Sequence, residues 1–193
     1  MSHNRVVRVV VLGVVLGASV LIGACDSQSP IDKVSQGAPA TAVDAARYVH
    51  EETKSFSDQD LKQVAVELVK DRDNQFIKQL VDELIYQTRD KQANKLAVLI
   101  AEQGFLVNND PVLANRAGLE YKIGRYVEKD YQKAAQILGT PVLRRSNVAK
   151  FYLAEVLLAD DNPNRDPARG KALLVESADA GVVQAKERLQ KLN

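Results

Sequence analysis

The sequence is poor in the residues that most often form crosslinks or metal sites: it contains one cysteine, two histidines and no tryptophan. A single thiol cannot form a disulfide within the chain, and His3 and His50 with one thiol do not supply the usual zinc ligand set. A histidine-dependent catalytic triad would need one of these two histidines, and no nucleophile elbow lies near either. We therefore predict that the protein is not an enzyme and uses no metal or cofactor.

The chain also lacks an excess of either charge. Its 26 lysines and arginines and 25 aspartates and glutamates give a formal net charge of +1, and both signs are interspersed along every segment. A protein that binds nucleic acid is expected to show a basic excess or a basic stripe facing the phosphates. The composition therefore predicts no nucleic-acid partner.

Long apolar runs are absent except near the N-terminus. Residues 6–22 are apolar apart from Arg8, two glycines and a serine, with Arg5 before them and small residues after them. This is the order of a secretory signal peptide, and the run is too short for a membrane span of about 20 apolar residues. We predict a signal peptide over residues 1–24, cleaved between Ala24 and Cys25.

The five residues Leu-Ile-Gly-Ala-Cys at positions 21–25 resemble the bacterial lipoprotein signal. The resemblance implies that Cys25 receives a diacylglyceryl group on its sulfur and an acyl chain, such as palmitate, on its freed amine. Cys25 would then be a lipid anchor that holds the protein at a membrane of the cell envelope, facing the periplasm. In that family an aspartate after the cysteine, here Asp26, favours the inner membrane, and the outer membrane is the alternative.

Residues 25–40 are polar, include two prolines and a glycine, and show no apolar period. We predict that this segment is a flexible tether. As a coil it would hold the folded part about 20 Å from the bilayer surface.

From Thr41 onward, apolar residues recur at helical spacing and no strand-like alternation occurs. The pattern predicts an all-α fold. Predicted N-caps are Ser57, Asp110 and Asp166, and predicted helix ends are Gly104, Gly124 and Gly181. The predicted helices cover residues 42–52, 58–70, 74–88, 93–103, 112–123, 131–138, 147–158, 168–180 and 182–192.

The second half of the chain repeats with a period of 36 residues. The equivalent pairs are Gly118 and Ala154, Asp130 and Asp166, Leu138 and Leu174, Ala149 and Ala185, and Leu153 and Leu189. Each period holds two predicted helices, and one pair of helices cannot bury both of its faces alone. We therefore predict an α-solenoid of antiparallel helical hairpins.

These positions resemble the Sel-one-like repeat, a relative of the tetratricopeptide helical hairpin. The resemblance covers Leu113 to Leu192, so we assign residues 109–193 to such repeats. Residues 41–108 are assigned to N-terminal hairpins, in which Phe76 to Gln103 is interpreted as a degenerate earlier unit. The residues that match the family pattern are Ala117, Gly118, Tyr121, Gly124, Val127, Asp130, Lys133 and Ala134 in the first repeat, and Ala149, Leu153, Ala154, Asp166, Ser177, Ala178, Gly181 and Ala185 in the next.

The resemblance implies a scaffold that binds envelope proteins through its stacked helices, in support of exopolysaccharide export or a secretion complex. If the first helix of each hairpin lines the inner face, the expected partner contacts are Arg116, Glu120, Lys150 and Tyr152. Charged side chains at such positions are also explained by solvation of a helix surface.

Two other functions remain open. Glu176 and Ser177 resemble the catalytic Glu-Ser of lytic transglycosylases, so one alternative is a peptidoglycan-acting enzyme or its regulator. The other is a small-ligand binding module. A calcium loop is disfavoured although Asp160, Asn162, Asn164 and Asp166 alternate as EF-hand ligands do, because Arg165 and Lys171 occupy the positions of the glycine and the last glutamate.

Overall fold

A computed structural model describes residues 29–192 of the chain. The predicted cleavage site at Ala24 and the predicted lipid attachment at Cys25 lie outside the described residues. Within the described residues, no helix combines the length and the apolar character that crossing a bilayer requires.

The described part of the chain is all-helical, as predicted, and contains no strand. Several predicted bounds match within a residue or two, because the caps that define them form as expected. The elements are α1 Pro30–Gly37, α2 Ala42–Glu52, α3 Asp58–Val69, α4 Asn74–Tyr86, α5 Lys91–Asn108, α6 Pro111–Ile123, α7 Tyr131–Leu138, the 3-10 turn η1 Pro141–Leu143, α8 Asn147–Leu158, α9 Pro167–Asp179 and α10 Val183–Gln190.

The predicted caps are present. Ser57 and Asp60 form a reciprocal capping box at α3, and the carboxylates of Asp110 and Asp166 accept backbone N–H groups at the starts of α6 and α9. Gly124 follows α6 with a φ of 75°, the left-handed conformation that terminates a helix most easily at glycine.

The predicted flexible tether is wrong over residues 30–37, which form helix α1. Ser29 caps this helix by accepting a hydrogen bond from the Asp32 amide, and Pro30 occupies a first-turn position where its missing N–H is not needed. Val34 is only 1% exposed and Ile31 packs against the same core. These two apolar side chains, together with a hydrogen bond from the Tyr48 hydroxyl of α2 to the Lys33 carbonyl, hold this short polar segment against its neighbours, and α1 packs mainly on α3.

The prediction that Gly104 ends a helix is also wrong, because α5 continues through it to Asn108. A Cβ at this position would lie 2.8 Å from side-chain carbons of both Ile77 in α4 and Leu113 in α6. The glycine therefore permits close approach of three helices. The helix ends instead at Asn109, which adopts a left-handed φ of 53°.

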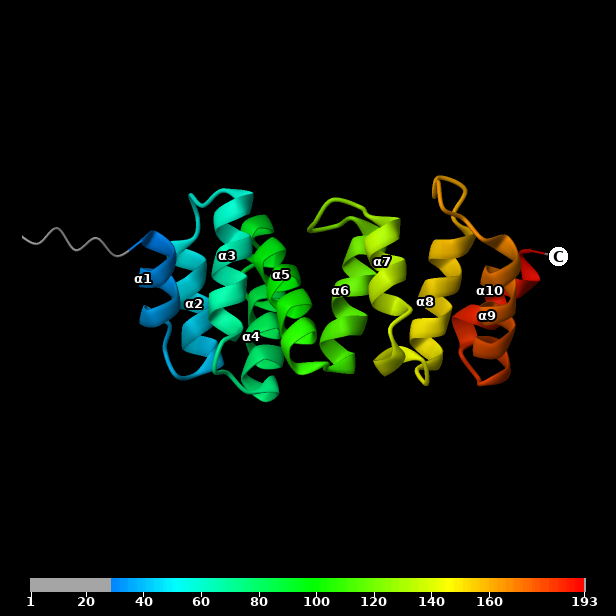
Figure 1. Cartoon of the computed structure of the whole chain (residues 1–193), viewed down its shortest axis with the longest axis horizontal. Coiled ribbons are helices and arrows are strands. Elements are labelled where there is room, and N and C mark those ends of the chain that lie inside the picture. The colour runs from blue at the N-terminus through cyan, green and yellow to red at the C-terminus, as the bar shows by residue number, and fades with distance from the viewer. Residues whose placement is uncertain (1–28, 193) are drawn as a thin grey trace, which may run out of the picture.

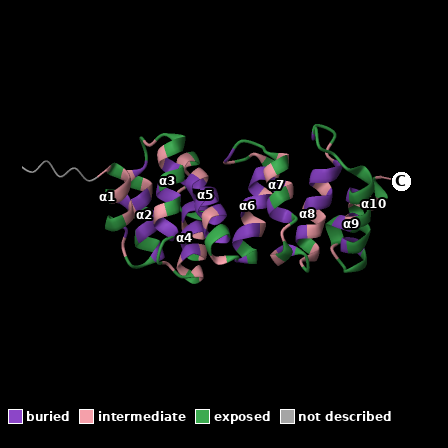
Figure 2. Ribbon diagram, viewed as in Figure 1, coloured by how far each residue is buried: buried purple, intermediate pink, exposed green. Residues whose placement is uncertain are grey.

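The helices follow one another along the long axis of the molecule, from α1 at one end to α10 at the other (Figure 1). In the first half, α1 packs on α3, α3 on α5, and α2 on α4, while α4 also packs on α5. From α5 onward each helix packs on the next one in the chain. Buried residues lie on the sides that face neighbouring helices, as Figure 2 shows.

Two loops in the second half share two hydrogen bonds at positions 36 residues apart. The amide of Asp130 donates to the carbonyl oxygen of Tyr121 over 2.9 Å, and the amide of Asp166 donates to that of Leu157 over 3.0 Å. Each aspartate then caps the following helix by accepting from the amide three residues later. The loops differ where they begin, because α6 is followed by the left-handed Gly124 and α8 by Ala159 in an extended conformation.

Candidate functional site

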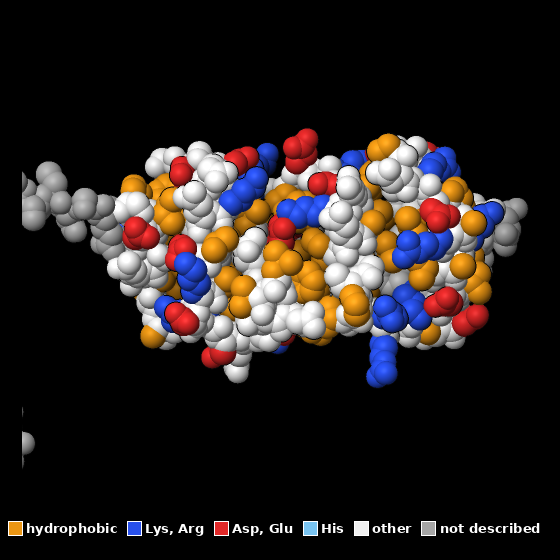
Figure 3. Space-filling view, viewed as in Figure 1, with side chains coloured by type: hydrophobic (Ala, Val, Ile, Leu, Met, Phe, Trp, Pro, Cys, Tyr) orange, Lys and Arg blue, Asp and Glu red, His pale blue; other side chains and the backbone are white. Residues whose placement is uncertain are grey.

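A cleft of about 620 Å³, which we call the junction cleft, lies where the two halves of the molecule meet. Its walls are the first turn of α3, the middle of α5, residues 127–133 and residues 161–164. Leu99, Tyr121 and Val127 give it an apolar floor. Figure 3 shows a hollow between α5 and α7 with hydrophobic side chains in its depth and charged side chains along its upper edge.

The cleft exists because the helix packing changes at this point. The helix α3 packs directly on α5, but α7 packs on α6 and α8 and does not form a packed pair with α5. The space between α5 and α7 is therefore left open, and α6 lies beneath it. The gap depends on how the two halves pack together, so the sequence of a single helix does not predict it.

A buried polar network joins the two halves beside the cleft floor. Glu102 of α5 accepts a hydrogen bond from the Tyr121 hydroxyl over 2.6 Å and pairs with the Lys133 ammonium over 2.6 Å. Lys133 also donates to the Tyr121 hydroxyl over 2.9 Å. Because Glu102 is 9% and Tyr121 6% exposed, this network fixes α5, α6 and α7 together in a water-poor setting where polar partners must be satisfied.

The pKa of Tyr121 is raised well above its usual value, first by burial and then by the hydrogen bond to Glu102. A raised folded-state pKa means that stability is complete below the unfolded tyrosine pKa of about 10 and is lost as the pH rises above it. We predict that Tyr121→Phe flattens the fall in unfolding free energy above pH 10, by up to about 1.4 kcal/mol per pH unit relative to the wild type. Urea unfolding between pH 8 and 11.5 measures this difference, and parallel curves for the two proteins would contradict it.

The rim of the cleft is closed on one side by a contact between two loops. Lys129 pairs with Asp161 over 2.6 Å, and the Tyr131 hydroxyl donates to the other Asp161 oxygen over 2.8 Å. Hydrogen bonds from Lys129 and Tyr131 lower the pKa of the Asp161 carboxyl. These contacts link the α6–α7 and α8–α9 loops, and both loops contribute to the cleft wall.

The polar side chains of the disfavoured calcium loop bind other protein groups. Asn162 is buried, its amide donates to the Val156 carbonyl over 2.7 Å, and its side-chain oxygen accepts from the Asn164 amide. Asp160 pairs with Arg165, and Asp166 caps α9. Among residues 29–192 no cluster of histidine, cysteine, aspartate or glutamate side chains could hold a metal ion.

Two of the four predicted contact residues, Arg116 and Glu120, line the same shallow groove beside α6. Arg116 pairs with Asp82 of α4 over 2.6 Å and lies 5.6 Å from the centre of the Tyr86 ring. Glu120, in contrast, is only 4% exposed and its carboxylate is bound by Arg125. Glu120 is therefore placed to orient Arg125, with little surface of its own to offer.

The other two predicted contacts lie on helix α8 and face different neighbours. Lys150 pairs with Glu176 of α9 over 2.9 Å. Tyr152 is half-buried, and the Lys122 ammonium of α6 lies 5.7 Å from the centre of its ring. Both side chains thus contribute to contacts between adjacent helices.

The Glu-Ser pair that resembles a transglycosylase motif lies at the α8–α9 interface. Glu176 is the partner of Lys150, and the Ser177 hydroxyl is buried and donates to the Asn147 carbonyl over 2.7 Å. Ser177 is therefore packed between the two helices, whereas Glu176 forms an exposed ion pair across them.

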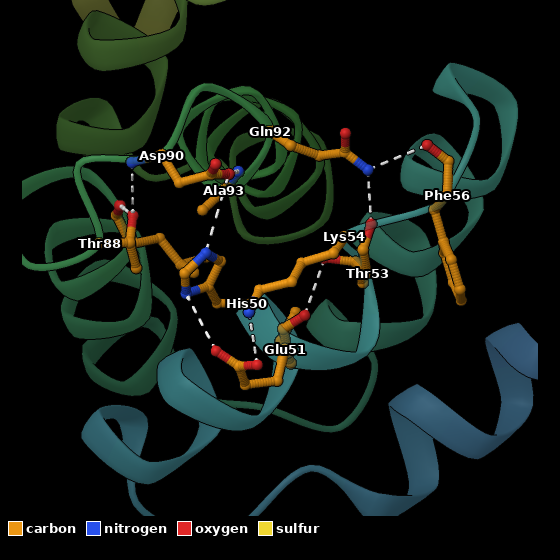
Figure 4. Close-up of polar contacts among 11 residues, drawn as sticks. His50, Glu51, Thr53, Lys54, Phe56, Thr88, Asp90, Gln92 and Ala93 are labelled. Carbon is orange, nitrogen blue, oxygen red and sulfur yellow. Dashed lines mark hydrogen bonds and ion pairs between the residues drawn. The ribbon is translucent and has the colours of Figure 1, made fainter.

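His50 lies in a polar cluster that joins α2 to the start of α5 (Figure 4). Its ring nitrogens lie 4.0 Å from Glu51 and 3.9 Å from Asp90. The two nearby hydroxyls, of Thr53 and Thr88, donate to helix carbonyl oxygens. Both hydroxyl protons are thus engaged by the backbone.

The junction cleft was not predicted from the sequence. One signal was available: Glu102 is a carboxylate among the apolar residues of a predicted helix, with Ala101, Gly104 and Phe105 around it. Such a residue needs a buried partner, but the sequence alone does not identify Tyr121 and Lys133.

Comparison of the chain with protein-family models, with curated proteins and with solved structures finds no match.

Proposed function

We propose that this protein is a lipid-anchored scaffold of the cell envelope that binds partner proteins through stacked helical hairpins. The observation that carries the proposal is the linear order of helix packing. The main helix pairs, from α1 on α3 to α9 on α10, join helices that are adjacent in the chain or one helix apart. Such an order is typical of proteins built from stacked repeats.

Local geometry also supports a solenoid with a period of 36 residues. The Asp130 and Asp166 loops, 36 residues apart, make the same backbone hydrogen bond to the preceding helix and the same N-cap hydrogen bond to the following one. In such a solenoid, rigid helices present side chains without a large ordering cost on binding. The protein would act through this geometry, by binding and without chemistry.

In this proposal the junction cleft receives a segment of a partner protein. It offers an apolar floor, charged walls and two loops that are linked by the Lys129–Asp161 contact. A lipid on Cys25 would confine the scaffold to the membrane surface and raise its effective concentration toward envelope partners. The resemblance to Sel-one-like repeats, together with the lipoprotein signal, favours an exopolysaccharide export or secretion complex as the assembly served.

The anchor gives a direct prediction. Protein purified from membranes should begin at Cys25 and carry acyl chains, which intact-mass and N-terminal peptide mass spectrometry detect. Cys25→Ser should abolish this modification and move most of the protein out of the membrane fraction, because acyl chains contribute about 0.8 kcal/mol of membrane affinity per buried CH₂. An unmodified N-terminus on the wild-type protein in membranes would overturn the anchor.

Partner binding at the cleft is tested by filling it. Gln132 is exposed on the first turn of α7 and lines the cleft, whereas Gln184 is exposed on α10 and lies outside it. Gln132→Trp should reduce co-purification of envelope proteins from detergent extracts at least fivefold, and Gln184→Trp should not. Equal recovery with both variants would contradict the use of this cleft.

One observation favours a second function, a small-ligand binding module. The cleft volume of about 620 Å³ falls within the range of about 300–1,000 Å³ that small-molecule sites occupy. A ligand of this kind would raise the melting temperature of the wild type but not of Gln132→Trp. A thermal-shift screen with soluble sugars and cell-wall fragments therefore separates this function from partner binding.

A further inference from the structure

A second concave surface, which we call the α6 groove, lies on the other side of α6 from the junction cleft. It has a volume of about 480 Å³, and its lining includes Tyr86, Val112, Arg116, Leu119 and Arg125. Val112 and Tyr121 are nine residues apart, which is two and a half helical turns, so they point to opposite sides of α6. The groove and the cleft are therefore independent surfaces.

The α6 groove contains apolar side chains that are more than half exposed. Tyr86 at the end of α4 is 65% exposed, and Val112 in the first turn of α6 is 54% exposed. Leu119, which also lines the groove, is half-buried. Isolated exposed apolar residues are ordinary, but here they line one concavity.

The charged side chains that line this groove are paired: Arg116 is neutralised by Asp82, and Arg125 by the buried Glu120. Leu143 and Ser146 also line the groove, and the two residues between them, Arg144 and Arg145, are exposed. Neither of these arginines has an ion-pair partner among the described residues, so the loop that borders the groove carries two uncompensated positive charges.

We propose that the α6 groove binds an extended acidic segment of a partner protein. Apolar side chains of the segment would pack on Tyr86, Val112 and Leu119, and its carboxylates would face Arg144 and Arg145. Guanidinium groups suit this role because they bind carboxylates through two parallel hydrogen bonds. The inference rests on the proposed scaffold function and adds to it a second surface and the chemistry of its ligand.

The test uses the processed lipoprotein in non-ionic detergent and two fluorescent eight-residue peptides. One peptide alternates phenylalanine and leucine with aspartate and glutamate, and the other replaces every acidic residue with lysine. Fluorescence anisotropy should show binding of the acidic peptide and at least tenfold weaker binding of the lysine peptide. Equal binding of both peptides, or no binding of the acidic one, would overturn the inference.

Matched variants locate the binding. The double variant Arg144→Glu, Arg145→Glu should weaken binding of the acidic peptide at least tenfold. The control Lys186→Glu, Lys191→Glu makes the same charge change at exposed positions near the C-terminus and should weaken binding less than twofold. Val112→Ser should weaken binding about threefold, and Val183→Ser, at a similarly exposed valine of α10, should not. Equal losses in the two charge variants would indicate non-specific attraction and contradict the groove.

Anionic membranes are the competing source of negative charge. If vesicles containing phosphatidylglycerol bind through Arg144 and Arg145 while the acidic peptide does not, the inference is wrong. Failure of this inference can be distinguished from failure of the proposed function. If co-purification of envelope proteins depends on Gln132 but the acidic peptide does not bind, only the inference about the α6 groove is overturned. Peptide binding without any co-purified envelope protein overturns the scaffold proposal instead.

Discussion

Replacing Gly104 with valine should lower the free energy of unfolding by about 2 kcal/mol or more. Glycine is worth up to about 1 kcal/mol less than other residues inside a helix, so valine gains backbone stability in α5. That gain is outweighed because the new Cβ would lie 2.8 Å from side-chain carbons of Ile77 and Leu113, two fully buried residues that would have to shift within the core. Overpacking in a filled core costs about 1–3 kcal/mol for added methylenes, and valine adds three carbons here.

Leu106→Val is the matched control for this prediction. It places the same β-branched residue in the same helix two positions later, at a side chain that is 61% exposed. Its effect should stay within about 0.5 kcal/mol, as for other surface substitutions. Urea unfolding followed by circular dichroism measures both variants, and equal stability of Gly104→Val and wild type would contradict the close approach of α4, α5 and α6.

Replacing Lys133 with methionine should cost about 2 kcal/mol, because it leaves the Glu102 carboxylate buried without its cation. Breaking a fully buried ion pair costs about 3–5 kcal/mol, and the lower figure reflects the 32% exposure of the Lys133 side chain. The Tyr121 hydroxyl would still bind Glu102 over 2.6 Å and retain part of the network.

The double variant distinguishes a charge effect from lost packing. Glu102→Gln removes the negative charge but keeps an oxygen that can accept from Tyr121, so combining it with Lys133→Met should be less destabilising than Lys133→Met alone. A double-mutant cycle should therefore give a coupling energy of about 1 kcal/mol or more between the two positions. Additive effects would show that the ion pair does not stabilise the junction.

Much of the fold could be predicted from the sequence because its signals are local. Capping residues such as Ser57, Asp110 and Asp166 bind the backbone within three positions, so helix starts can be read directly. The bounds of α2, α7 and α8 agree with those predicted. Apolar periodicity then identified the buried side of most helices.

What could not be predicted depends on contacts between distant segments. Helix α1 is polar overall, and its burial depends on a surface that α3 supplies. Glycine often follows the last turn of a helix, so Gly104 was predicted to end one. Its actual role is set by Ile77 and Leu113 on other helices. The junction cleft follows from the absence of a packed pair between α5 and α7, which no local pattern expresses.

The predicted contact residues illustrate the same limit within one helix. Arg116 and Glu120 lie one turn apart on α6, and the helical period alone gives them similar faces. Both line the α6 groove, but they differ in burial: Arg116 is half-buried, while Glu120 is only 4% exposed and lies under Arg125. The charge of Glu120 was visible in the sequence, but the arginine that covers it lies beyond the end of the helix.

The central claim, that this protein acts by holding another protein against its stacked helices, is tested most directly by photo-crosslinking in intact cells. A photoreactive amino acid would replace Gln132 in the junction cleft, or Lys171 on the exposed side of α9 as the comparison. The account predicts a light-dependent adduct with one envelope protein from position 132 and none from position 171. No adduct from position 132, or the same adducts from both positions, would contradict it.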